Sequence, residues 1–253
     1  MLIKKTLILL AAIVIAGSTV FAQKSLYSMT VNGALNLSDM DISNLKTKLK
    51  AGYNFNATFE YNLPKNFFLQ TGIGFSNKGA KVKDHESGMM RGSELATIIQ
   101  DERIDLNDTY YYASAADGKY NTQYITIPLM GGYRLSVSEK IRMNLSLGPY
   151  FGYGIGGKSK TSQVIAARSS FTIPGNGMNE SNDFTIAVGR GYDVKSFDIL
   201  KRFDMGLRGN VGIEYHRFLL NVGYEYGFIN QIKEGDGSSY NMNLFVGLGF
   251  RVF

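Results

Sequence analysis

The 253-residue chain has no cysteine and no tryptophan, 4 prolines, 29 glycines, 16 tyrosines and 16 phenylalanines, and a formal net charge of +6. The absence of cysteine excludes a disulfide framework and a thiolate site, and a charge this mild does not indicate a nucleic-acid partner. Many tyrosines, phenylalanines and glycines beside few prolines favour β-strands with aromatic girdles over helices.

The first 22 residues have the pattern of a secretory signal peptide. Lys4 and Lys5 precede an unbroken apolar run over 7–16, and small residues flank Phe21 where a signal peptidase would cut. The run is half of the roughly 20 apolar residues that a membrane-spanning helix needs. We therefore expect cleavage before Gln23, so that residues 23–253 form the mature chain, with a charge of about +4 (+6 minus the two lysines).

Eight segments of the mature chain alternate apolar residues with small or polar ones at a period of two, the pattern of a β-strand with two unlike faces. In the clearest, every odd position from Ala51 to Tyr61 is apolar, and the even positions are small or polar. Pro128 removes a ladder donor from the fourth segment and predicts a β-bulge there. In chain order the segments are 29–37, 49–62, 67–76, 123–135, 141–155, 203–215, 218–228 and 240–253.

The connections between these segments alternate in length. Three are tight turns around Pro64, Ser138 and His216, and the longer ones are 38–48, 79–121, 157–202 and 230–239. Transmembrane β-barrels combine an even strand number with short periplasmic turns and longer extracellular loops, and only a closed sheet satisfies its backbone in lipid. The pattern predicts an all-β fold: an eight-stranded antiparallel up-and-down transmembrane β-barrel in the outer membrane, with two long extracellular loops and periplasmic termini.

A soluble barrel of lipocalin type is the alternative fold. That group typically carries a Gly-x-Trp motif, and this chain has no tryptophan. A soluble barrel would also turn its apolar face inward, and an eight-strand lumen is too narrow for so many bulky aromatic side chains.

Six stretches that span most of the mature chain are informative together: VNGALNLSDM (31–40), LQTGIGFSNKGAK (69–81), YITIPLMGGYRL (124–135), LGPYFGYGIGG (147–157), FDMGLRGNVGIEY (203–215) and VGYEYGFINQI (222–232). They resemble the outer-membrane β-barrel family labelled PorT-like or "porin family". The resemblance implies an eight-stranded fold and an outer-membrane location, without a catalytic motif or proven pore activity. One departure is Arg251, third from the end, where such barrels usually carry an aromatic residue.

By the same alternation, several charged side chains face the barrel interior. A hairpin centred on His216-Arg217 pairs residues whose numbers sum to 433, so we expect Arg208 to lie opposite Glu225. The others fall near the tight-turn end, where we expect a second ionic cluster. Side chains can fill an eight-strand barrel, so we interpret these charges as structural and the lumen as closed; a narrow proton- or ion-selective path is the alternative. The inward charges are Glu60, Arg134, Arg142, Arg208, Glu214, Glu225 and Arg251.

No catalytic, cofactor or metal site is predicted. Asp84-His85-Glu86-Ser87 offers an acid, a base and a nucleophile, but consecutive residues in a loop cannot converge on one reacting atom. The acidic residues of 101–108 lack the spacing of a calcium-binding loop.

The two longest connections carry the remaining candidates. Tyr110, Tyr111, Tyr112 and Phe171 are aromatic side chains suited to anchoring a partner; alternatively, these stretches extend the strands beyond the membrane or pack over the barrel mouth. We predict a non-enzymatic protein with a structural, adhesive or envelope-assembly role. The expected partners are outer-membrane lipid, the barrel-assembly machinery and a surface or secretion-complex protein, with no nucleic acid. A narrow diffusion channel and a lipid-modifying enzyme are the alternative functions.

Overall fold

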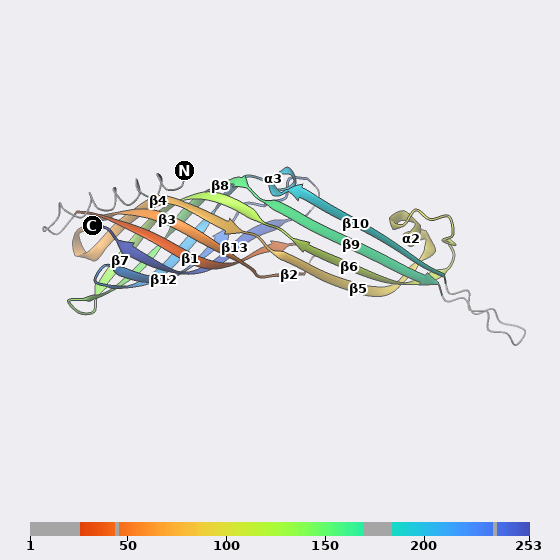
Figure 1. Cartoon of the computed structure of the whole chain (residues 1–253), viewed down its shortest axis with the longest axis horizontal. Coiled ribbons are helices and arrows are strands. Elements are labelled where there is room, and N and C mark those ends of the chain that lie inside the picture. The colour runs from red at the N-terminus through yellow and green to blue at the C-terminus, as the bar shows by residue number, and fades with distance from the viewer. Residues whose placement is uncertain (1–25, 44–45, 170–183, 235–236) are drawn as a thin grey trace, which may run out of the picture.

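A computed structural model of the chain describes residues 26–43, 46–169, 184–234 and 237–253. Eight of its strands close into an antiparallel barrel in the order β1-β13-β12-β11-β8-β7-β4-β3 (Figure 1). The predicted eight-stranded barrel is therefore confirmed, while the predicted signal peptide lies outside the described residues. The barrel strands are β1 (Tyr27–Ile42), β3 (Lys50–Asn62), β4 (Phe67–Lys78), β7 (Thr122–Ser136), β8 (Ile141–Gly156), β11 (Phe203–Tyr215), β12 (Phe218–Gly227) and β13 (Ser239–Arg251).

The barrel carries its apolar side chains on the outside. β12 alternates exposed and buried at every residue, with Leu220 and Val222 exposed and Asn221 buried between them. Leu35 and Leu248 are 75% and 71% exposed. Large contiguous apolar surfaces mark sites of membrane or protein contact, and an apolar outer band around a polar interior is the arrangement of a transmembrane barrel.

The three tight turns lie together at one end of the barrel. The short 3-10 turn η1 (Pro64–Asn66) joins β3 to β4, and His216 takes a positive φ of 55° between β11 and β12. Arg251 donates its backbone N–H to the carbonyl of Arg217 at 2.7 Å, so the last strand ends beside the β11–β12 turn.

At the opposite end, the stretches expected as long loops form a second sheet. The order of strands in this sheet is β10-β9-β6-β5-β2. Each of these strands is next in the chain to one barrel strand. Those barrel strands are neighbours in the matching order β11-β8-β7-β4-β3. Five of the eight barrel strands thus continue beyond the rim (Figure 1). This agrees with the alternative interpretation of 79–121 and 157–202, in which these stretches extend the strands beyond the membrane. The strands of this sheet are β2 (Thr47–Lys48), β5 (Lys81–Arg91), β6 (Thr109–Lys119), β9 (Lys158–Ser169) and β10 (Phe184–Lys195).

The five-stranded sheet has a small hydrophobic core of its own. The helix α2 (Gly92–Ile98) brings Leu95 against one face of the sheet at its far end (Figure 1). The buried members of this core are Leu95, Ile99, Ile104, Tyr110, Ala167 and Ile186. None of the helices among the described residues is long and apolar enough to cross a membrane.

Two glycines mark the boundary between barrel and sheet. Gly79, between β4 and β5, and Gly157, between β8 and β9, have φ values of +139° and +134°. A Cβ on Gly79 would lie 2.1 Å from the carbonyl oxygen of Tyr120, and one on Gly157 would lie 2.0 Å from that of Asn121. Both glycines therefore let the chain pass close to the backbone of the β6–β7 junction in a conformation that a side chain would disfavour.

The bulge expected at Pro128 lies elsewhere. β7 keeps one register on both sides of Pro128, pairing Ile127 with Phe151 and Gly131 with Leu147, and its shift falls between Gln123 and Tyr124. The expectation was wrong because a proline removes a donor without requiring an extra residue in the strand.

We expect Gly79→Ala and Gly157→Ala each to destabilise the folded barrel by about 1–3 kcal/mol, because each forces a β-carbon into a neighbouring backbone in a conformation that suits glycine. The measurement is the temperature at which the folded, heat-modifiable form disappears on a gel. Gly131→Ala is the matched control, because a Cβ there meets nothing within 4 Å. If all three variants melt together, the glycines do not set the boundary.

Candidate functional site

An ionic cluster fills the barrel lumen at the tight-turn end. The Glu60 carboxylate forms salt bridges with Arg134 at 2.5 Å and with Arg251 at 2.8 Å. The Glu214 carboxylate forms a salt bridge with Arg251 at 2.8 Å and another with Arg142. The five side chains come from five strands. Glu60, Glu214 and Arg251 are buried, whereas the side chains of Arg134 and Arg142 are partly exposed, by 13% and 37%. The structure thus brings together all five residues that the sequence places at this end.

A second ionic cluster lies nearer the sheet. The register pairs Arg208 with Glu225, and their charged groups are 2.7 Å apart. Lys78 Nζ lies 2.6 Å from the other oxygen of Glu225, and Asn243 donates to that oxygen at 3.1 Å. Sequence reasoning missed Lys78 because it ended the third strand at Ser76, whereas β4 continues to Lys78. Ser76 faces the interior, and Lys78 lies two residues further along the same strand. Extending the strand by two residues would therefore have placed Lys78 in the interior as well.

Asp204 is a further buried charge that sequence reasoning left out, although it shares the inward phase of Arg208. Its carboxylate accepts hydrogen bonds from Tyr150 at 3.1 Å, Asn241 at 3.0 Å and Gln231 at 3.3 Å. Each of these donors comes from a different segment around the lumen. Asp204 therefore organises a hydrogen-bonded layer across the barrel, beyond Glu225 toward the sheet.

An apolar layer covers the barrel mouth at the sheet end. The single-turn helix α3 (Ser196–Ile199) directs Phe197 over Gly154, where a Cβ would lie 2.1 Å from the phenyl ring. The ring packs edge-on to Tyr124, with centroids 5.4 Å apart. The buried members of this layer are Met40, Ala80, Tyr124, Phe197 and Leu200.

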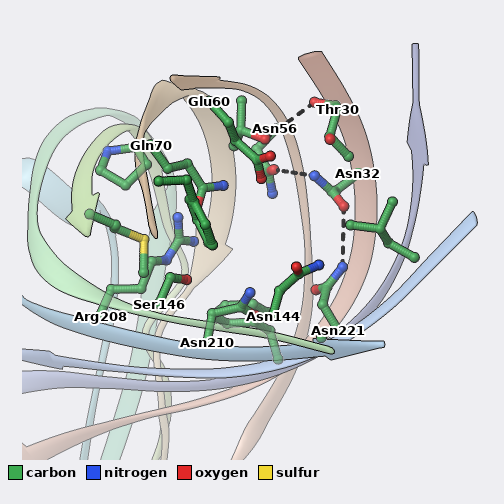
Figure 2. Close-up of a pocket in the computed structure, with 17 residues that line it drawn as sticks. Thr30, Asn32, Asn56, Glu60, Gln70, Asn144, Ser146, Arg208, Asn210 and Asn221 are labelled. Atoms are coloured by element: carbon green, nitrogen blue, oxygen red, sulfur yellow. Dashed lines mark hydrogen bonds between the residues drawn. The ribbon is translucent and has the colours of Figure 1, made fainter. Parts of the chain in front are cut away.

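Between the two ionic clusters lies a cavity of about 50 Å³ (Figure 2). Glu60 of one cluster and Arg208 of the other both line it. Asn32 donates to Asn56 at 3.0 Å and accepts from Asn221 at 3.1 Å across its wall. A volume of this size accommodates a few water molecules, and it is too small for a solute of metabolite size.

The aromatic candidates of the long connections have different positions. Tyr110 is buried in the core of the five-stranded sheet, where its hydroxyl accepts the N–H of Asp105 at 2.9 Å, so the expectation that it is an exposed anchor was wrong. Tyr112 is half-buried against the same core. Tyr111 is 51% exposed on the other face. Phe171 lies outside the described residues.

The residues considered for catalysis and metal binding do not assemble into a site. Asp84 is buried while His85 is exposed, because neighbouring residues of β5 point to opposite faces. The described residues contain no group of three or more His, Asp or Glu side chains that could hold a metal ion. In the acidic stretch, the Asp101 carboxylate accepts two hydrogen bonds from Arg103, which lower the pKa of that carboxyl.

Residues 21–233 match the family described as "Outer membrane protein beta-barrel domain". The chain belongs to this family. Its exposed apolar belt therefore faces the lipid of the outer membrane. No curated protein matches the sequence.

Several solved outer-membrane proteins are similar to this barrel at low identity. Ail, the attachment invasion locus protein of Yersinia pestis, is 13% identical over 90% of this chain and 99% of its own, with a TM-score of 0.36. OprG from Pseudomonas aeruginosa is 12% identical over 88% and 95%, with a TM-score of 0.43. Neisserial surface protein A is 12% identical over 89% and 97%, with a TM-score of 0.35. At TM-scores this low, the overlays add nothing to the family match.

We expect Glu225→Gln to destabilise the barrel by about 3–5 kcal/mol, because it leaves two buried cations, Lys78 and Arg208, without their carboxylate. The measurement is urea unfolding in detergent micelles, followed by circular dichroism. Adding Arg208→Met to Glu225→Gln should restore part of the loss, since one of the uncompensated cations is then removed.

Glu139→Gln, an exposed carboxylate in a tight turn, is the control and should leave stability unchanged. If Glu225→Gln unfolds at the same urea concentration as Glu139→Gln, then Glu225 is not buried between two cations.

Proposed function

We propose that this outer-membrane barrel is not an enzyme and that it acts by presenting its five-stranded sheet to a partner outside the membrane, in an adhesive or envelope-assembly role. The observation that carries the proposal is the sheet itself, which has its own hydrophobic core and continues the barrel wall well past the rim. Closing and anchoring a barrel needs neither, so we infer that the sheet serves contacts beyond the membrane.

The outward face of the sheet offers a contact patch. Met89 and Tyr111 are directly opposite each other on β5 and β6 and are 64% and 51% exposed. Arg168 on β9 lies opposite Tyr111. Tyrosine and arginine are over-represented among residues that dominate protein–protein binding energy, and methionine is enriched at interfaces. This patch replaces Tyr110 and Tyr112 as the proposed anchor.

We propose that the sheet is extracellular and that the tight turns and the C-terminus are periplasmic. The support is the general arrangement of outer-membrane barrels, which have short periplasmic turns and longer extracellular segments, together with the predicted signal peptide.

We also propose that the chain belongs to the PorT-like branch of such barrels. The basis is the resemblance of the six stretches 31–40, 69–81, 124–135, 147–157, 203–215 and 222–232. Outer-membrane lipid, the barrel-assembly machinery and a surface or secretion-complex protein are the partners we propose.

Attachment of cells that produce the protein tests this role. Met89→Ser with Tyr111→Ser should reduce attachment to protein-coated surfaces, or cell–cell aggregation, by at least about tenfold, because two central anchors each cost about 2 kcal/mol when truncated. Tyr192→Ser is the matched control, since Tyr192 is 57% exposed on the same sheet but outside the patch. Equal attachment by a protein whose segments 83–117 and 160–193 are replaced by short turns would rule the role out.

A narrow channel is the second candidate, and the side chains in the lumen argue against it. Two ionic clusters, the Asp204 layer and Phe197 lie across the barrel in succession. We expect the purified protein to give no stable conductance steps in a planar bilayer, in the manner of a detergent-only control. Stable, large steps that require the protein would contradict a closed lumen.

A further inference from the structure

A row of lysines crosses the five-stranded sheet next to the barrel rim. The registers place Lys81 opposite Lys119 and Lys119 opposite Lys160, and Lys48 on the short edge strand lies opposite Lys81. All four side chains are exposed. Directly opposed residues share one face of a sheet, with Cβ atoms about 4.5–5.5 Å apart. The ammonium groups therefore form a line along that face.

More lysines than carboxylates accompany this row. Lys158 and Lys195 form a second opposed pair beside it, one step nearer the barrel. Along β5, β6, β9 and β10, the carboxylates on this face are Asp117 and Asp193, and Asp193 is 2.9 Å from Lys160. Like charges in opposed positions destabilise a sheet. An anion that binds across these lysines would lower the repulsion between their ammonium groups.

The row borders a groove at the boundary between sheet and barrel. The groove has a volume of about 300 Å³, and Lys119, Lys158 and Lys160 line it together with Tyr53. Tyr53 belongs to the outer face of β3, where it stacks on Phe75 with ring centroids 6.0 Å apart. Lys50, which is buried, also lines the groove and donates to Asn77 at 2.6 Å. The cationic groove therefore begins where the lipid-facing surface ends.

We propose that this lysine row and groove bind the phosphate groups of membrane-lipid headgroups around the barrel rim. The position favours lipid over a soluble polyanion, because Tyr53 joins the groove to the lipid-facing belt and tyrosine is enriched at membrane–water interfaces. Neighbouring strands repeat every 4.7–4.9 Å or so, so adjacent lysines can share one phosphate. This function is separate from partner binding and requires only that the barrel spans a membrane.

The test titrates the detergent-solubilised full-length protein with phosphatidic acid, and with phosphatidylcholine as the net-neutral headgroup, and counts bound lipid by native mass spectrometry. The wild type should prefer phosphatidic acid by more than tenfold. Lys119→Gln with Lys158→Gln should weaken phosphatidic acid binding about fivefold for each lysine and leave phosphatidylcholine unchanged. Lys119→Arg with Lys158→Arg should retain the preference, because the charge stays.

Lys65→Gln with Lys140→Gln is the matched control, because it removes two exposed lysines from the tight-turn end. If this pair and the groove pair weaken phosphatidic acid equally, the groove is not the site. Dextran sulfate serves as the soluble polyanion. If it binds with the same dependence on Lys119 and Lys158 while the lipid preference is absent, the ligand is not a headgroup and the proposal fails. Should the double variant not fold, the two single variants answer the same question.

Discussion

The structure depends on the pairing of charges inside a closed sheet. A barrel in lipid satisfies its backbone only by closing, and eight strands enclose a lumen that side chains must fill. Here the filling is ionic: Glu60, Glu214 and Glu225 each contact two basic side chains. Taking a charge out of water is costly unless a partner compensates it. The ionic clusters therefore tie strands that are distant in the sequence into one register, and they leave little room for a passage.

The sheet beyond the rim follows from the same register. Because β4, β7 and β8 are already aligned in the barrel, their continuations β5, β6 and β9 emerge as neighbours in the same order. Gly79 and Gly157 allow the chain to pass close to the β6–β7 backbone at the junction between barrel and sheet. One protein thus carries two surfaces with different chemistry: an apolar belt for the membrane, and above it a face that begins with lysines and ends in exposed Met89 and Tyr111.

The sequence predicted the barrel well because lipid and lumen impose opposite polarity on alternate residues, and that contrast is visible in 49–62 or 203–228 without any tertiary information. Counting residues outward from the predicted turn at His216-Arg217 likewise places Arg208 opposite Glu225. Lys78 and Asp204 were missed because their roles depend on where a strand ends and on what lies across the lumen. The sheet was missed because its hydrophobic core is small and lies around α2. Most residues of β5 and β6 are small or polar and at least partly exposed on both faces, so no sustained apolar alternation marks these strands. Phe197 reaches the barrel mouth only through the path of β10 and α3.

Water access to single introduced thiols tests the closed, filled barrel most directly, since the chain has no cysteine of its own. With the protein in lipid vesicles, a membrane-impermeant maleimide should label Lys83→Cys on the exposed sheet. It should leave Ser146→Cys, whose side chain lines the small internal cavity, and Leu145→Cys on the lipid face unlabelled. Labelling of Ser146→Cys as fast as Lys83→Cys would show a water-filled lumen and would contradict the account.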